Sequence, residues 1–250
     1  MDRSYLEAEL RSTSIFQNST EVRLAILSDI HEDYENLLKI VGEAESRGFD
    51  KLICLGDISG FSLPHYKYGK SRNASACLAL LREKCDIIIV GNHDIHAAGI
   101  DPELPDILKG QETWQHELDL DPGYSEEDIS FLATLPLYDI LSTTAGNILF
   151  SHYVYPNLSG IVKGFYYSEK EFQEHFAFML EHECSLCFTG HAHPRGFYRV
   201  NPGGFKHYRY RGIKITSFPA LIGIPQATRH EHRSSFCIFD TNSLRLQVIR

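Results

Sequence analysis

The sequence predicts an α/β fold with a largely parallel β-sheet in its first half. In the first 95 residues, short apolar runs alternate with stretches of helical periodicity, which is typical of βαβ units. Each apolar run ends abruptly in polar residues, as strands do where they deliver side chains to a site. Towards the C-terminus, paired runs flank short turn sequences, which indicates antiparallel strands.

In the first half, the expected strands are the apolar runs at 22–27, 51–55 and 86–90. The stretch 33–48 places Leu37, Leu38 and Val41 at helical spacing before Gly48, a typical helix stop. A second helix is expected near 72–84. Strand, helix and strand therefore alternate twice.

The second half begins with residues 95–136, expected to be mostly loop and short helix, with Ser125 as the N-cap of one helix. Residues 137–153 are expected to form a hairpin around a Gly-Asn turn. A helix over 168–183 should lead into a strand at 184–193, and antiparallel pairs are expected at 195–210 and 235–249. Because no linker or repeat interrupts this series, one domain is expected over 22–250, after a polar lead-in at 1–21.

Composition limits the function classes. The hydrophobic content of 43% and the charged content of 23% are ordinary for a soluble globular protein of 250 residues. The net charge of -9 argues against a nucleic-acid coat, which needs an excess of Lys and Arg. It allows a small phosphorylated substrate, because a bound metal reverses the local field. The 13 histidines are a first indication of metal.

The N-terminal residues lack the apolar core of a signal peptide, and no segment has the length of a membrane span. A cytoplasmic protein without membrane attachment is therefore expected. Its six cysteines then read as buried small residues rather than as disulfides. The Cys184/Cys187 pair is read as two inward residues of one strand, in preference to a redox or metal role.

Five apolar runs end in residues that bind metals. The side chains concerned are Asp29 and His31, then Asp57, then Asn92 with His93, then His152, and last His191 and His193. In open α/β sheets, ligands bind beyond the carboxyl ends of the strands, so these groups can converge although they are far apart in sequence.

Imidazoles and carboxylates together favour Mn, Fe, Zn or Ni over the all-oxygen sites of Ca and Mg. Two divalent ions would carry four positive charges, and only Asp29 and Asp57 would offset them. The surplus of positive charge would suit a phosphate and a hydroxide. The residue types therefore predict a centre of two divalent ions.

The motifs SDIH, LGDISG, VGNHD, SHY and TGHAH, in this order and spacing, resemble the calcineurin-like metallophosphoesterases. The rest of the chain also looks similar to their compact single-domain bacterial and archaeal branch. The stretch SEEDISFLATLPL before the hairpin, the run FPALIGIPQ and the closing hairpin add to the likeness, which covers residues 22–250. The resemblance implies a four-layer αββα sandwich with two mixed β-sheets.

The same resemblance implies a metal-dependent phosphoesterase, a hydrolase acting on ester bonds. Its substrate would be a small phosphodiester or phosphomonoester, with nucleotide-derived esters among the candidates. A hydroxide bridging two metals would attack phosphorus in line. A homodimer is a further candidate, without an interface that the sequence identifies.

Residue by residue, the resemblance assigns Asp29, His31, Asp57 and His193 to one metal. It assigns Asp57 as the bridge to a second metal, which Asn92, His152 and His191 complete. His93 would face the substrate and donate a proton to the leaving oxygen or steady the phosphate charge, with Asn92 beside it. Asp94 would orient His93.

Several positions depart from the family pattern. Glu32 and Tyr153 stand where the family usually has Gly, and GHAH and FPAL replace related runs. Tyr153 is expected either to narrow the pocket or to offer its hydroxyl to phosphate. Arg195, just past the last ligand, is a candidate phosphate contact, and a surface arginine at a strand edge is the alternative.

The loop 60–72 is aromatic and locally basic. A solvated loop packed on the body is the favoured interpretation, and a stacking platform of Phe61, Tyr66 and Tyr68 is the alternative. The remaining histidines, His65 and His116 among them, are interpreted as core or surface residues.

Two other functions stay open. A phosphoprotein phosphatase shares the same centre and would need an open, shallow cleft, whereas the aromatic loops indicate a more enclosed site. A non-catalytic metal-binding scaffold of the same fold is the second alternative. The complete ligand set together with His93 argues against it.

Overall fold

The apolar runs of the first half form the parallel part of a six-stranded sheet. In the computed structural model, β1 (Arg23–Leu27), β2 (Lys51–Cys54) and β3 (Ile87–Ile88) pair in parallel and are joined by α2 (Tyr34–Arg47) and α3 (Ala74–Lys84). Parallel neighbours need crossovers of this kind. The structure describes residues 20–101, 104–209, 211–230 and 233–250, so nearly all of the predicted lead-in at 1–21 lies outside the described residues.

Antiparallel strands from the C-terminal part complete this sheet. β13 (Phe236–Asp240) pairs with β1, β14 (Arg245–Ile249) pairs with β13, and β9 (Ile213–Lys214) pairs with β14. The strand order is therefore β3-β2-β1-β13-β14-β9. The predicted hairpin at 235–249 is confirmed, and it turns a parallel sheet into a mixed one.

The second sheet also has six strands, in the order β4-β5-β6-β10-β7-β8. Its members are β4 (Tyr138–Thr143), β5 (Gly146–Ser151), β6 (Cys184–Thr189), β7 (Phe197–Asn201), β8 (Gly204–Tyr208) and β10 (Ala220–Gly223). β5, β6 and β10 are parallel, and the outer pairs are antiparallel.

The hairpin of β4 and β5 was predicted correctly, but its Gly-Asn turn was placed wrongly. Thr144 and Ala145 connect the strands, while Gly146 and Asn147 already belong to β5. The Thr143 hydroxyl donates to the Gly146 carbonyl at 2.9 Å and accepts from the Ala145 amide at 3.1 Å. These bonds close the turn two residues earlier than the sequence suggested.

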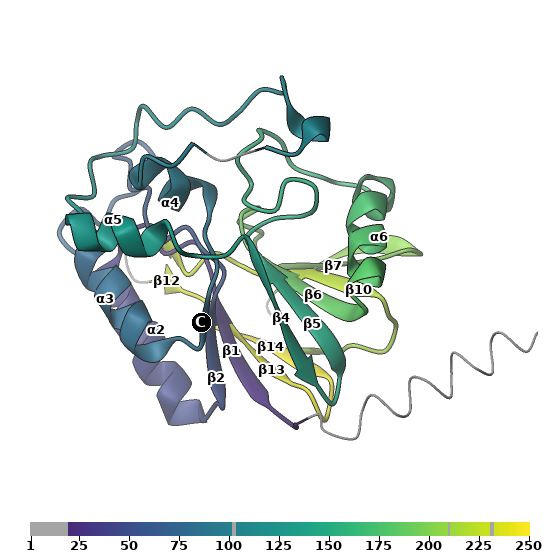
Figure 1. Cartoon of the computed structure of the whole chain (residues 1–250). Helices are drawn as coiled ribbons and strands as arrows, with labels where there is room; N and C mark the ends of the chain where they lie inside the picture. Colours follow the sequence, from purple (N-terminus) through teal and green to yellow (C-terminus); the bar gives the residue numbers. More distant parts are fainter. Residues whose placement is uncertain (1–19, 102–103, 210, 231–232) are drawn as a thin grey trace, which may run out of the picture.

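The two sheets pack face to face, and helices cover their outer faces (Figure 1). α2, α3 and α5 (Glu126–Leu132) lie on the first sheet, and α6 (Gln173–Glu181) lies on the second. Alternate residues of β1 pack into two separate apolar layers of the core. Leu24 and Ile26 face the second sheet, and Ala25 and Leu27 face the helices. The predicted αββα sandwich with two mixed sheets is confirmed.

Local signals explain the helix ends. The Asp33 side chain accepts the Asn36 amide at the start of α2, and the Ser125 side chain accepts the Asp128 amide at the start of α5, as predicted. Leu38 is 44% exposed, so the buried face of α2 is built on Ile40 instead. The remaining elements are α4 (Asn92–Ala97), the short 3-10 helices η2 (Asp106–Leu108) and η3 (Glu169–Phe172), β11 (Thr228–His230) and β12 (Arg233–Ser234).

The cysteines are free thiols, as expected. Cys184 and Cys187 are buried residues of β6 that pack in the layer under α6. A register shift between β5 and β6 falls between these two positions, which allows both side chains to face the same layer.

The carboxyl ends of β1, β2, β5 and β6 meet at one edge of the sandwich, at the top of Figure 1. Two long loops lie over this edge: the described residues of 98–125, which are 98–101 and 104–125, and residues 152–168. Among the described residues, no helix combines the length and the apolar character needed to cross a bilayer.

Candidate metal centre

The predicted ligands have an unusual backbone. Five of the eight described non-glycine residues with positive φ are predicted metal ligands: Asp29 (60°), His31 (49°), Asp57 (52°), His191 (61°) and His193 (43°). Left-handed φ is costly for side chains other than glycine and persists where surrounding contacts fix it, often at functional sites. The chain therefore bends sharply just past β1, β2 and β6, which turns these side chains towards one another.

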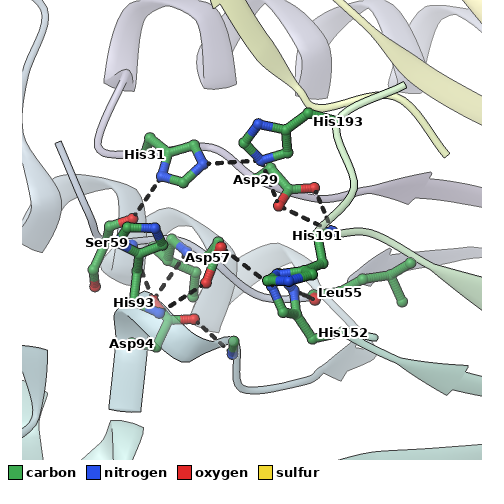
Figure 2. Close-up of polar contacts among 12 residues, drawn as sticks. Asp29, His31, Leu55, Asp57, Ser59, His93, Asp94, His152, His191 and His193 are labelled. Carbon is green, nitrogen blue, oxygen red and sulfur yellow. Dashed lines mark hydrogen bonds and ion pairs between the residues drawn. The ribbon is translucent and has the colours of Figure 1, made fainter. Parts of the chain in front are cut away.

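A first group of ligand atoms comes from Asp29, His31, Asp57 and His193, all within 4.8 Å of one another. Nε2 of His193 lies 3.0 Å from Oδ1 of Asp29 and 3.3 Å from Nε2 of His31 (Figure 2). All but His193 are fully or nearly fully buried. Two imidazole nitrogens that meet beside a carboxylate are arranged as the ligands of one cation.

A second group comes from Asp57, His152 and His191. Nε2 of His152 lies 3.1 Å from Oδ2 of Asp57 and 3.2 Å from Nδ1 of His191 (Figure 2). Asp57 belongs to both groups, which is the position of a bridging carboxylate. Gly91 allows this approach, because a Cβ there would lie 2.2 Å from Oδ1 of Asp57.

Backbone carbonyls set the tautomers of two histidines. Nδ1 of His31 lies 3.0 Å from the Ser59 carbonyl, and Nδ1 of His152 lies 2.7 Å from the Leu55 carbonyl. A carbonyl only accepts, so each Nδ1 carries the proton when the ring is neutral. Each Nε2 then presents its lone pair to the centre, as in metal-ligating histidines.

The pKa values of the site follow from burial and close charges. Burial raises the pKa of Asp29, but the charge and hydrogen bond of His193 more than offset this and bring it to about 2. Burial, helped by like charges nearby, lowers the pKa of His31 and of His191 to about 3. Burial lowers the pKa of His152, but Asp57 raises it to about 9 overall. The carboxylate of Asp57 thus favours a proton on His152, and a metal cation bound between the two side chains would replace that proton.

The donor set fits two divalent ions. It contains two carboxylates, four imidazoles and the amide of Asn92, the mixture that transition metals and zinc favour. Among the described residues, Oδ1 of Asn92 is a buried polar atom without a hydrogen-bond partner. A buried polar atom without a partner is energetically costly, and a metal ion bound to the Asn92 oxygen would satisfy it.

His93 lines the cavity above the two groups. Its Nδ1 lies 2.5 Å from Oδ2 of Asp119, and the same oxygen lies 3.2 Å from Nδ1 of His116. Burial lowers the pKa of His93, but Asp57 and the Asp119 hydrogen bond raise it to about 9.

The prediction that Asp94 orients His93 is wrong. Oδ1 of Asp94 accepts the amides of Ile58 and Ser59, each at 2.9 Å, and Oδ2 accepts the Gly91 amide at 3.1 Å (Figure 2). The reason is helix geometry: both residues lie in the first turn of α4, where successive side chains point about 100° apart. Asp94 therefore fixes the loop that carries Asp57, and Asp119 contacts His93.

The segment that carries Asp119 is attached to the rest of the site through Glu32 and Arg72. Oε1 of Glu32 accepts the amides of Gly60 and Phe61 at 3.2 and 3.1 Å, and Oε2 pairs with Nε of Arg72 at 2.6 Å. Nη2 of Arg72 donates to the carbonyls of Leu120, at 3.2 Å, and Asp121. Glu32 thus stands where the family pattern has Gly and holds the chain on both sides of the cavity.

The cavity has a volume of about 650 Å³. Asn92, His93 and Arg195, the predicted substrate contacts, are among the residues that line it. Tyr153 does not: it is 1% exposed, packs on His191 with ring centroids 4.6 Å apart, and its hydroxyl accepts the Tyr166 amide at 2.9 Å. Neither role expected for Tyr153 is therefore open to it.

Of the proposed platform in loop 60–72, only Tyr66 lines the cavity, where it stacks on His31 at 4.8 Å. Phe61 and Tyr68 are buried behind it, at 1% and 5% exposure. The cavity residues that sequence reasoning missed include Trp114, His116, Asp119 and Phe165, and His65 also lines the cavity. Trp114, His116, Asp119 and Phe165 lie in the two long loops, away from any strand end, and the length of these loops is the one signal that could have pointed to them.

Comparison with known proteins places these features in context. The profile of a family described as calcineurin-like phosphoesterase matches residues 22–195. An uncharacterized protein of Methanocaldococcus jannaschii is 25% identical over 247 residues, covering 91% of this chain and 86% of that protein.

Two solved structures share the fold of this chain. A metallophosphoesterase from Sphaerobacter thermophilus is similar with a TM-score of 0.66 at 20% identity, covering 92% of this chain and 88% of that one. A hypothetical protein from Pyrococcus horikoshii is similar with a TM-score of 0.60 at 16% identity, covering 91% of this chain and 87% of that one.

Proposed function

This chain belongs to the calcineurin-like phosphoesterase family, and we propose that it hydrolyses a small phosphodiester or phosphomonoester with two divalent metal ions. One observation carries the proposal: two groups of ligand atoms, all buried except those of His193, share Asp57. Ions about 3.5–4 Å apart that share a carboxylate can act on one phosphoryl group.

The proposed ligands of the first ion are Asp29, His31, Asp57 and His193, and those of the second are Asp57, Asn92, His152 and His191. When bound, the ions would supply Lewis-acid stabilisation of the phosphoryl oxygens and would acidify a water molecule as the nucleophile. Mn, Fe, Zn and Ni suit this donor set. The protein contributes two negative charges through Asp29 and Asp57, so the loaded centre would keep a positive surplus that attracts an anionic ester.

His93 is the proposed proton donor. Its Nδ1 is engaged by Asp119, which leaves Nε2 as the ring nitrogen for a substrate. Burial lowers the pKa of His93, and the charges of Asp57 and Asp119 raise it; bound ions would offset the charge of Asp57, whereas the contact with Asp119 would remain and favour the protonated ring. It can therefore give a proton to the departing oxygen and offset charge that develops there. Asp119 holds the proton on Nδ1 and fixes the ring.

The test compares turnover of bis(p-nitrophenyl) phosphate and p-nitrophenyl phosphate. Protein stripped of metal is titrated with Mn²⁺, alongside Asn92→Ala and His93→Ala. His207→Ala, which removes an exposed histidine of β8, is the matched control. We expect metal-dependent turnover that falls at least about a hundredfold in His93→Ala, which removes a group that offsets charge in the transition state. Turnover should also fall in Asn92→Ala, which removes a ligand of the second ion, and should be unchanged in the control.

The better ester will distinguish a diesterase from a monoesterase. Two bound metal ions without turnover of either ester would instead favour the non-catalytic scaffold. A protein that binds no divalent metal would refute the proposal.

A further inference from the structure

The two long loops over the site are joined to each other. The Trp114 amide donates to the Ile161 carbonyl at 3.0 Å, and the Lys163 amide donates to the Glu112 carbonyl at 2.8 Å. The side chains of Lys163 and Glu112 form an ion pair of 2.5 Å. The first of these loops follows β3 of the first sheet and α4, and the second follows β5 of the second sheet. The short antiparallel contact between the loops therefore connects the two halves of the sandwich.

A side chain fixes the second loop from within. Nδ2 of Asn157 donates to the Val162 carbonyl at 2.8 Å, and its Oδ1 accepts the Val162 amide at 3.1 Å. Both partners are buried. Gly160 lies against His191, since a Cβ there would be 2.6 Å from Nδ1 of that ring. The loop thus has a defined shape directly over a predicted metal ligand.

The joined loops place two aromatic rings, Trp114 and Phe165, on the cavity wall; they are called the aromatic wall below. Their ring centroids are 5.6 Å apart at an interplanar angle of 46°. Phe165 lies 5.3 Å and Trp114 lies 6.2 Å from the ring of His191. Both residues are only partly buried, so their rings still present apolar surface to the cavity.

Neither ring carries a charge or a metal-ligating atom, and the indole N–H of Trp114, which is buried without a hydrogen-bond partner among the described residues, is the one polar group of the wall. The wall carries no charge, whereas the groups beside it are carboxylates and imidazoles that bind ions. A volume of about 650 Å³ lies in the range of sites for whole small molecules and far exceeds the needs of a phosphate alone. Arg195 is the one Lys or Arg in the described lining, so little of this space is suited to further phosphates.

We propose that the aromatic wall binds a planar aromatic substituent of the phosphoester, an aryl group or a nucleobase, beside the second group of ligands. This inference rests on the proposed function, because it names the class of ester that the same site accepts. Flat rings stack on aromatic side chains irrespective of their hydrogen-bonding edges, so the wall would select for an aromatic substituent rather than for one particular base. The competing explanation is that both rings only cover His191.

The chain offers a direct probe, because Trp114 is its single tryptophan. The Zn²⁺-loaded protein is titrated with adenosine 5′-monophosphate and with ribose 5-phosphate, which carries the same phosphate without the base. Tryptophan emission and calorimetry are both followed. We expect saturable quenching with the nucleotide alone, and an affinity for it at least about tenfold higher than for the sugar phosphate.

Phe165→Leu keeps an apolar side chain but removes the ring. It should weaken nucleotide binding by about tenfold and leave ribose 5-phosphate binding unchanged. Trp114→Leu, followed by calorimetry, should do the same. Tyr167→Ala is the matched control, since Tyr167 belongs to the same loop and is 74% exposed. Circular dichroism and metal content establish that the variants are folded and loaded.

The results separate this inference from the proposed function. Equal affinities for the two phosphates, or variants that weaken both equally, would overturn the aromatic subsite even if the protein hydrolyses p-nitrophenyl esters. A tenfold preference for the nucleotide that Phe165→Leu abolishes would support the subsite even if no ester were hydrolysed.

Discussion

Replacing Asp119 by Asn tests how His93 is held. Oδ2 of Asp119 lies 2.5 Å from Nδ1 of His93, and the Asp119 side chain is 11% exposed. Asn preserves the size of the side chain and removes its charge. The variant therefore removes the electrostatic support of the imidazolium while the segment around it stays in place. Asp119 belongs to neither group of proposed ligands for the two metal ions, so the content of both should be unchanged.

The size of the effect follows from this contact. A hydrogen bond to a charged group contributes about 1.5–3 kcal/mol, and about 1.4 kcal/mol corresponds to one pKa unit. The pKa of His93, raised to about 9 by Asp57 and Asp119 against the effect of burial, should therefore fall by about 1–2 units. Loss of a residue that orients a functional group typically costs about 10–100-fold in activity, and we expect kcat to fall within that range.

The assay is a pH–rate profile of kcat for two diesters, one with a p-nitrophenolate leaving group and one with an alkoxide leaving group. The alkaline limb of Asp119→Asn should move to lower pH by about 1–2 units. The loss should be larger for the alkoxide, which depends more on a proton donor. Glu117→Gln, an exposed carboxylate of the same segment, should match the wild type. An unchanged profile, or equal losses for both esters, would refute the role of Asp119.

Three further predictions concern the frame of the site. Glu32→Gln breaks a nearly buried ion pair and should lower the free energy of unfolding by about 3 kcal/mol in urea, whereas Glu43→Gln, at an exposed pair, should cost less than about 1 kcal/mol. Gly91→Ala would place a Cβ 2.2 Å from the bridging carboxylate and should reduce the metal content measured by atomic emission; Gly42→Ala, with open space around it, should keep the full content and gain up to about 1 kcal/mol. Burial lowers the pKa of His175 to about 3, below about 6.5 in an unfolded chain, so stability is lost as the pH falls below about 6.5, and His175→Gln should reduce this loss by up to about 1.4 kcal/mol per pH unit between about pH 6 and 4. A pH slope equal to that of the wild type, a stable Glu32→Gln or a fully metal-loaded Gly91→Ala would contradict the corresponding argument.

The convergence of the predicted ligands could be predicted from the sequence because it depends only on the direction in which the strands run. Asp29, Asp57, His152 and His191 each follow a strand whose carboxyl end lies at the same edge of the sandwich. Short apolar runs and the polar residues after them are local signals. They fix where the side chains emerge, even though the left-handed backbone at these positions was not foreseen.

The loops could not be placed in this way. Trp114 reaches the cavity because its amide pairs with the Ile161 carbonyl, 47 residues further on. Asp119 reaches His93 because a neighbouring carbonyl is held by Arg72. Such contacts between distant segments leave no periodicity in the sequence. The choice of Asp94 failed for a related reason, since adjacency in sequence was taken for adjacency in space.

Glu32 contacts the loop after β2 directly and the segment that carries Asp119 through Arg72. Its replacement by Gly, the usual residue of the family, has opposing effects on the free energy of unfolding. The residue has a φ of 69°, a conformation that costs a side chain about 1–2 kcal/mol and that Gly adopts freely. Leaving Arg72 without its buried partner costs about 3–5 kcal/mol. Gly also leaves the buried amides of Gly60 and Phe61 without the acceptor that Gln retains, at a cost of about 1–3 kcal/mol each. Because this loss outweighs the relief of backbone strain, Glu32→Gly should destabilise the protein by more than Glu32→Gln when both are unfolded in urea, and both should lower kcat by loosening the segment that carries Asp119. A Glu32→Gly protein as stable and as active as the wild type would mean that the carboxylate contributes nothing beyond filling a position that Gly could occupy.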